Sequence, residues 1–206
     1  LAATNAAGAI NQTAGAITGL SLGARAGGAV TLTSATNDVT TIAGNVSGAG
    51  NGFQYTDATT VAVGSVAAGG LFTATDGVST SNGAIALSTI DGALTVTNTV
   101  AATDVNAGTS TVSLTAGSLA AADNALIIDL NATVTGTAGI TLTADHMNIV
   151  SAAGGINAGV ATATLAQSQN GTAIILGGIV ADATAATLEL SASELAAITA
   201  GTIAIG

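Results

Sequence analysis

Residues 136–206 read GTAGITLTADHMNIVSAAGGINAGVATATLAQSQNGTAIILGGIVADATAATLELSASELAAITAGTIAIG, a succession of short apolar segments separated by Gly and Asn. Branched apolar residues lie two positions apart in these segments, which places their side chains on one face of a β-strand. Thr, Ala or Glu stands between them. The pairs are Ile140 and Leu142, Ile174 and Leu176, Leu188 and Leu190, and Ile203 and Ile205.

Such segments are too short to hold a sheet face alone and too alike to form different layers of a mixed domain. Stacking them as successive coils buries their apolar faces in one continuous core. The stretch therefore predicts an all-β fold, a parallel β-helix (β-solenoid). A meander of β-hairpins is the competing architecture, and it is less favoured because many segments contain only three or four residues.

The same unit recurs towards the N-terminus, at Gly28–Thr33, Gly83–Ser88 and Gly92–Thr97. Because the pattern touches the whole chain, we expect residues 1–206 to be a single solenoid segment excised from a longer repetitive protein. Coils of roughly 20 to 25 residues would give about nine coils and a rod of roughly 45 Å, without an evident cap at either end. Turn signals are expected at the corners, at Asn51-Gly52, Asp76-Gly77, Asn82-Gly83, Asp91-Gly92 and Asn170-Gly171.

One short helix is expected near residues 191–200. Ser191 and Glu194 have the spacing of a capping box, in which each side chain bonds the main chain beside the other. Apolar residues continue at helical spacing from Leu195 to Ile198, and Gly201 follows.

The composition requires a thin core. Hydrophobic residues make up 49% of the 206 residues but aromatic residues only 1%, and there are 28 Gly. A narrow stack of Val, Ile, Leu and Ala between sheets meets that condition. The chain has no Cys, so thiol chemistry is excluded.

Charge is sparse and acidic, with eleven carboxylates, Arg25 as the one Lys or Arg, and a net charge of -10. Nucleic acid binding and attraction to anionic membranes both need clustered cations, so neither partner is expected. No apolar run approaches the ~20 residues that span a bilayer, so we expect no membrane insertion. The acidity serves most simply to keep an apolar-rich surface soluble.

Residues for catalysis are scarce, and we expect no enzyme activity, no metal site and no cofactor. Asp145 could orient His146, but neighbours on a strand point to opposite faces, so His146 is interpreted as a surface or corner residue. The acidic residues Asp38, Asp57, Asp91, Asp104, Asp123 and Asp129 are isolated in sequence. A polysaccharide-active β-helix enzyme stays open as an alternative, because carboxylates such as Asp129 and Asp145 could meet across coils.

Two of the three aromatic residues, Phe53 and Tyr55, lie two positions apart and so share one strand face. They are the only candidate site residues, as a weak surface contact on which a sugar could stack. The simpler interpretation is that the rings cover an irregular coil.

Thr-x-Thr recurs through the chain and raises the alternative of an ice-binding solenoid, in which stacked hydroxyls order water. Its starts are irregularly spaced, and the ordinary preference of Thr for exposed strand positions explains it more simply. The pairs are Thr31/Thr33, Thr73/Thr75, Thr95/Thr97, Thr109/Thr111, Thr133/Thr135, Thr141/Thr143 and Thr162/Thr164.

The sequence resembles the repeat regions of large filamentous-haemagglutinin-like exoproteins of the two-partner secretion type. The matching segments are GAINQTAGAITG, ARAGGAVTLTS, NDVTTIAGNVSGAGNGFQYTD, GITLTAD, GGINAG and ELAAITAGTIAIG. The resemblance implies a right-handed parallel β-helix that a Gram-negative-type bacterium exports through an outer-membrane transporter. It also implies display at the cell surface as a fibre for adhesion or cell contact. No functional residue of the family can be assigned here.

We therefore expect the structural shaft of a secreted fibre or adhesin, which provides length and rigidity. Its expected partners are other copies of itself or adjoining repeats, end to end, and a host or cell-surface glycan.

Overall fold

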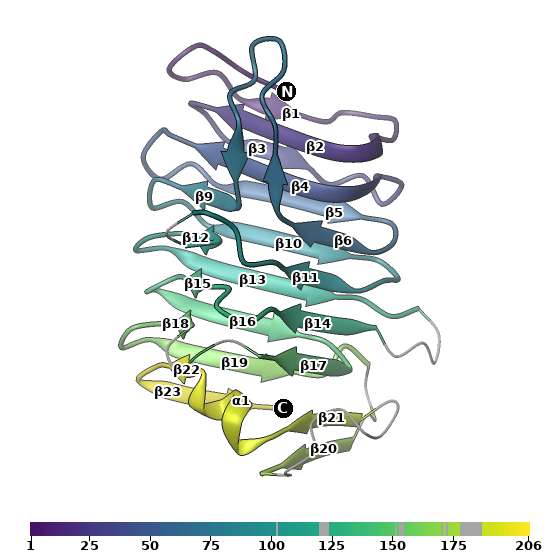
Figure 1. Cartoon of the computed structure of the whole chain (residues 1–206), viewed down its shortest axis with the longest axis vertical. Helices are drawn as coiled ribbons and strands as arrows, with labels where there is room; N and C mark the ends of the chain where they lie inside the picture. Colours follow the sequence, from purple (N-terminus) through teal and green to yellow (C-terminus); the bar gives the residue numbers. More distant parts are fainter. Residues whose placement is uncertain are drawn as a thin grey trace.

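The computed structural model describes residues 1–101, 103–119, 124–150, 152, 155–169, 171, 173–177 and 187–206. Two long parallel sheets face each other along a rod, and the chain alternates between them as it advances (Figure 1). This is a parallel β-solenoid, so the predicted fold class is confirmed. The competing hairpin meander is wrong, because all pairings within the two long sheets are parallel.

One wall of the rod is the eight-stranded sheet, to which each coil contributes one strand. In spatial order its strands are β1 (Ile10–Asn11), β3 (Val30–Leu32), β5 (Phe53–Asp57), β10 (Ile85–Thr89), β13 (Thr111–Ala116), β16 (Gly139–Thr143), β19 (Thr162–Ala166) and β23 (Thr202–Ile205).

The other wall is the eleven-stranded sheet. Its strands are β2 (Thr18–Ala26), β4 (Asp38–Val46), β6 (Val61–Val63), β9 (Val78–Thr80), β11 (Leu94–Val96), β12 (Val105–Asn106), β14 (Ala125–Ile128), β15 (Val134–Thr135), β17 (His146–Ile149), β18 (Ile156–Asn157) and β22 (Ile198–Thr199). No helix in the described part of the chain is long and apolar enough to cross a membrane.

Strand register gives the coil lengths directly. The residues in one column of the eight-stranded sheet are Ile10, Val30, Phe53, Ile85, Val112, Ile140, Ala163 and Ile203, so successive coils contain 20, 23, 32, 27, 28, 23 and 40 residues. The predicted 20 to 25 residues thus holds for three coils, and the other four are longer. Seven steps of about 4.8 Å separate the first strand from the last, or about 34 Å, which is shorter than predicted.

The core is a thin stack of aliphatic side chains between the two walls. Val63, Val96 and Ile128 repeat in one column of the eleven-stranded sheet, each with none of its surface exposed. Leu87, Leu114 and Leu142 repeat opposite them at 2% exposure or less. Burying each such side chain stabilises the fold by about 1.5–3 kcal/mol. The predicted thin core is sufficient to stabilise the rod because it continues from coil to coil.

Segments that leave the ladder at one shared corner recur in four successive coils, and further length is added between β13 and β14 and between β19 and β22. β2 and β4 run unbroken across the eleven-stranded sheet, but each later coil breaks at the same place in the register. The inserted segments are 64–77, 97–104, 129–133 and 150–155. Extra length is therefore absorbed outside the ladder, and the strands stay in register.

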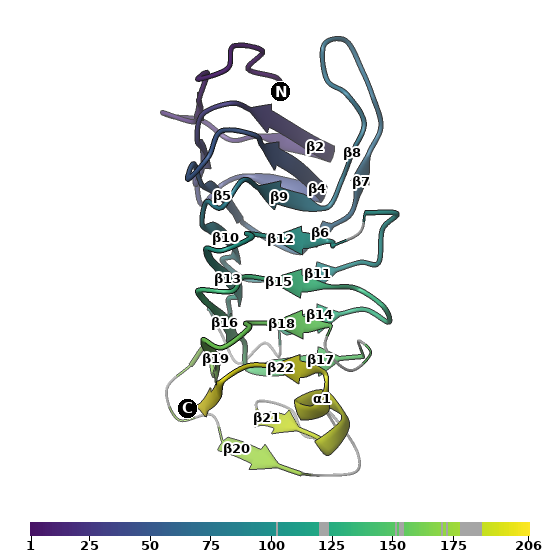
Figure 2. The same cartoon turned by 90° about the vertical axis from the view of Figure 1, so that its left-hand side faces the viewer.

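The longest of these four segments, 64–77, contains an antiparallel hairpin formed by β7 (Ser65–Val66) and β8 (Thr75–Asp76). It folds back along the rod over β4 and β2, and its loop reaches the N-terminal end (Figures 1 and 2). Phe72 near its tip packs on Gly23 of β2, where a Cβ would lie 2.1 Å from the ring. The predicted corner at Asp76-Gly77 is thus the base of this hairpin.

The C-terminal end is partly covered, contrary to expectation. A separate parallel pair, β20 (Ala173–Leu176) and β21 (Thr187–Leu190), and the helix α1 (Ala192–Ala196) lie beyond β17 (Figure 1). The predicted capping box is confirmed, with Ser191 as the N-cap and Glu194 as its partner.

Candidate functional site

Phe53 and Tyr55 share one strand face as predicted, but that face points inwards. The side chains are 0% and 1% exposed, so the predicted surface contact is wrong. Alternation along β5 fixes which residues share a face, whereas the opposite wall decides which face is covered. Neither ring is accessible to a sugar.

Tyr55 and Asp57 form a buried polar pair at the end of β5. The Tyr55 hydroxyl donates to Asp57 Oδ2 at 2.5 Å, and the Val39 and Thr59 amides donate to the same carboxylate at 2.9 Å each. Burial raises the pKa of Tyr55 above its ordinary value, and the hydrogen bond and charge of Asp57 raise this pKa further. The Tyr55 phenol is thus neutral and donates to a carboxylate that also accepts two amide hydrogen bonds. We conclude that the pair has a structural role.

Asp104 makes the same kind of contact further along the rod. It is 1% exposed, and its carboxylate accepts the Thr99 amide at 2.7 Å and the Thr133 amide at 2.9 Å. Thr133 precedes β15, the strand that pairs with β12 directly after Asp104. The carboxylate therefore connects two successive coils.

Asp145 and Glu194 continue this pattern. Asp145, 2% exposed, accepts the Gln169 amide at 2.8 Å, and Glu194, 3% exposed, accepts the Ile149 amide at 3.0 Å. Through the second contact, helix α1 satisfies a donor of β17. All four buried carboxylates in the described residues thus bind main-chain N–H groups, as buried charges must.

The carboxylates of the described residues do not converge. Ile128 pairs with Ile149 and Ala125 with His146, so Asp129 and Asp145 flank opposite ends of the β14–β17 pair. Five residues along a strand correspond to about 16 Å, too far for two catalytic carboxylates. Asp38 and Asp91 bind neighbouring coils through Thr59 and Asn124, and Asp123 lies outside the described residues.

His146 is partly exposed on β17 while Asp145 beside it is buried, which agrees with the prediction that the two side chains point to different faces. Among the residues that the structure describes, no three His, Asp or Glu side chains gather where they could hold a metal ion.

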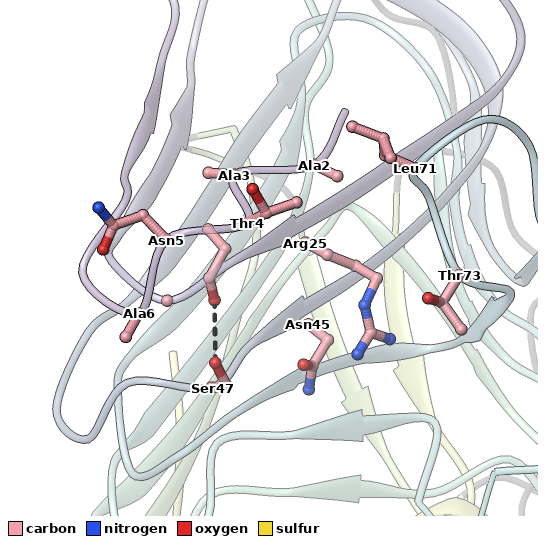
Figure 3. Close-up of a pocket in the computed structure, with 12 residues that line it drawn as sticks. Ala2, Ala3, Thr4, Asn5, Ala6, Arg25, Asn45, Ser47, Leu71 and Thr73 are labelled. Atoms are coloured by element: carbon pink, nitrogen blue, oxygen red, sulfur yellow. Dashed lines mark hydrogen bonds between the residues drawn. The ribbon is translucent and has the colours of Figure 1, made fainter.

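A cleft of about 280 Å³ lies at the N-terminal end, between residues 2–6 and the tip of the hairpin (Figure 3). Arg25 reaches into it between Asn45 and Thr73 and donates to Thr75 Oγ1 at 3.1 Å. Thr75 in turn donates to the Thr73 carbonyl at 2.9 Å. The guanidinium thus fastens the hairpin to β2 in a cleft that contains no carboxylate.

Sequence reasoning missed Asn37, which is fully buried at a corner. Its amide group donates to the Leu32 and Thr56 carbonyls at 3.2 and 3.1 Å, and its Oδ1 accepts the Ile17 amide at 2.9 Å. A lone Asn in a Gly- and Thr-rich sequence is typical of turns, so no signal set this residue apart.

No family model, no curated protein and no solved structure matches this chain.

Proposed function

We propose that the chain is a structural shaft, a rigid segment of an extracellular fibre or adhesin. The observation that carries the proposal is the use of the buried carboxylates. Asp57, Asp104, Asp145 and Glu194 each hold the main chain of a neighbouring segment, so the buried carboxylates of the described residues join segments of the chain to one another.

Rigidity follows from two kinds of contact between coils. Parallel ladders join the strands of successive coils in both walls, and the carboxylates add charge-assisted hydrogen bonds between neighbouring segments. Sliding one coil against the next would break both at once. A polysaccharide-active enzyme is the weaker proposal, because such activity needs converging acids.

Growth of the shaft in both directions is part of the proposal. β1 and β23 are the outer strands of the eight-stranded sheet and run parallel, so β23 of one unit can pair with β1 of the next. Leu20, 82% exposed, and Ile203, 40% exposed, lie on the end strands β2 and β23. The adjoining unit is a second copy or a neighbouring repeat.

Export, localisation and the other partners rest on the sequence resemblance alone. We propose secretion by a Gram-negative-type bacterium, an outer-membrane transporter as the export partner, and a glycan on a host or neighbouring cell as the target of the complete fibre.

Small-angle scattering with increasing concentration tests the shaft. A rod of constant cross-section that lengthens with concentration is expected, and Leu20→Lys with Ile203→Lys should stop lengthening by placing charge on both end strands. Val100→Lys is the matched control, because Val100 is 88% exposed on a lateral insertion. A flexible envelope, or cleavage of acidic polysaccharide by the purified chain, would contradict the proposal.

A further inference from the structure

Hydroxyl side chains form a two-dimensional lattice on the outer face of the eight-stranded sheet. One column consists of Thr56, Ser88, Thr115 and Thr143, which are register partners in four consecutive coils. The neighbouring column contains Ser113, Thr141 and Thr164 in three consecutive coils. Thr111, Thr162 and Thr202 lie in a third column, which Gly139 interrupts.

The spacings of this lattice follow from β geometry. Residues in one column repeat about every 4.8 Å, and adjacent columns lie about 6.6 Å apart because alternate residues share a face. Thr-x-Thr pairs are irregularly spaced in the sequence because the coils differ in length. The extra residues lie outside the strands, so the register between coils, and with it the lattice, is unchanged. Irregular spacing of Thr-x-Thr in the sequence therefore does not exclude a regular hydroxyl surface, contrary to the expectation from the sequence.

The hydroxyls of this lattice are available to solvent. Thr111, Thr141 and Thr162 are exposed, and Ser113, Thr115, Thr143 and Thr164 are partly exposed. Thr56 and Ser88 bond each other at 3.0 Å, but no side-chain hydrogen bond within the described residues uses the hydroxyls of the other eight. The hairpin lies over the opposite wall, as Figure 2 shows.

This face carries no charge although the chain has eleven carboxylates. The one acid in the eight strands is Asp57, which points inwards. The face lacks both the charges that would recognise an ionic partner and exposed aromatic rings on which a sugar could stack, since Phe53 and Tyr55 are in the core.

We infer that the outer face of the eight-stranded sheet binds ice. An ice surface is its complement, a flat, rigid and neutral lattice of hydrogen-bond donors and acceptors. Thr has few χ1 states on a strand, and the solenoid fixes the backbone, so the water layer that joins the two lattices is ordered at little entropic cost.

Partition of the fluorescently labelled 206-residue chain into a slowly growing ice shell, together with thermal hysteresis, tests this inference. The wild-type chain should be incorporated and should depress the freezing point below the melting point. Thr141→Tyr should lose both activities, because its ring stands above the plane of the lattice, while Tyr remains favourable in a strand. Thr95→Tyr is the matched control, since Thr95 points outwards on β11 in the opposite wall.

Circular dichroism checks that each variant is folded, and Thr164→Tyr replaces Thr141→Tyr if the latter is not. Exclusion of the wild-type chain from ice would overturn the inference. Equal losses in Thr141→Tyr and Thr95→Tyr, or retention on crystalline cellulose with no incorporation into ice, would overturn it as well. None of these results depends on lengthening of the rod.

Discussion

Gly44 on β4 and Phe53 on β5 meet inside the solenoid so closely that a Cβ on Gly44 would lie 2.1 Å from Cε2 of the ring. In the coils that follow, the column of Gly44 contains Val78, Val105 and Val134, each fully buried. The glycine thus provides the volume that the only inward-facing Phe of the described core requires.

Gly44→Ala should lower the free energy of unfolding by about 1–3 kcal/mol through overpacking. Phe53→Leu alone leaves a cavity, but the double variant should be less destabilised than the two single changes added together, because the smaller side chain makes room for the new methyl group. Urea denaturation of the four proteins gives the coupling free energy. Additive losses would show that the two residues do not compete for the same space.

Asp57→Ala should cost about 3 kcal/mol, because it leaves the Val39 amide and the Tyr55 hydroxyl buried without an acceptor. Asp38→Ala is the matched control. Asp38 is exposed, and its one hydrogen bond among the described residues comes from the Thr59 hydroxyl at 3.0 Å, so its loss should stay within about 0.5 kcal/mol. Equal shifts of the urea midpoint in the two variants would refute the structural role of Asp57.

Alkaline pH should destabilise the protein through Tyr55. Its pKa is raised in the folded state, so the fold retains a proton that the unfolded chain releases above about pH 10. The stabilisation is complete below that pH and falls by up to about 1.4 kcal/mol per pH unit above it. Because Tyr55 is the only Tyr, tyrosinate absorbance should rise together with unfolding.

Tyr55→Phe is the variant that isolates this effect. It should be about 1 kcal/mol less stable at neutral pH, having lost a hydrogen bond, but its free energy of unfolding should change less between about pH 10 and pH 12. The same alkaline slope in both proteins would mean that another group is responsible.

Deletion of residues 65–77 should leave a folded solenoid. Val63 and Val78 pair with Ile42 and Gly44, so one residue between them, Gly64, suffices to restore an unbroken strand like β4. The deletion removes the packing of Phe72 on Gly23 and should cost about 2 kcal/mol. Cooperative thermal unfolding, with faster amide exchange confined to β2 and β4, is expected, and loss of cooperativity would contradict it.

Strand positions were predictable wherever alternation and glycine punctuation coincide. The unit at Gly83–Ser88 contains most of β10, and the unit at Gly92–Thr97 contains β11. Helix α1 was predictable because the capping box is a local interaction between Ser191 and Glu194. These features depend only on neighbours in the chain.

Features that depend on the opposite wall or the next coil were not predictable. Phe53 and Tyr55 were correctly placed on one face, but the space for the Phe53 ring depends on Gly44, which no local pattern connects to it. The hydroxyl lattice likewise depends on the register between coils, and variable insertions hide that register in the sequence. Asp57 and Asp104 looked isolated because their partners are backbone amides.

One corner of the solenoid provides a series of insertion sites, one in each of four successive coils. The chain leaves the ladder there at segments 64–77, 97–104, 129–133 and 150–155. Peptides of quite different length are accepted there while the strands beneath keep their partners, so foreign epitopes, reporter tags or catalytic loops could be grafted at chosen levels. Because successive insertion sites are one coil apart, the grafted peptides would be displayed in a line along the rod, at multiples of about 4.8 Å from one another.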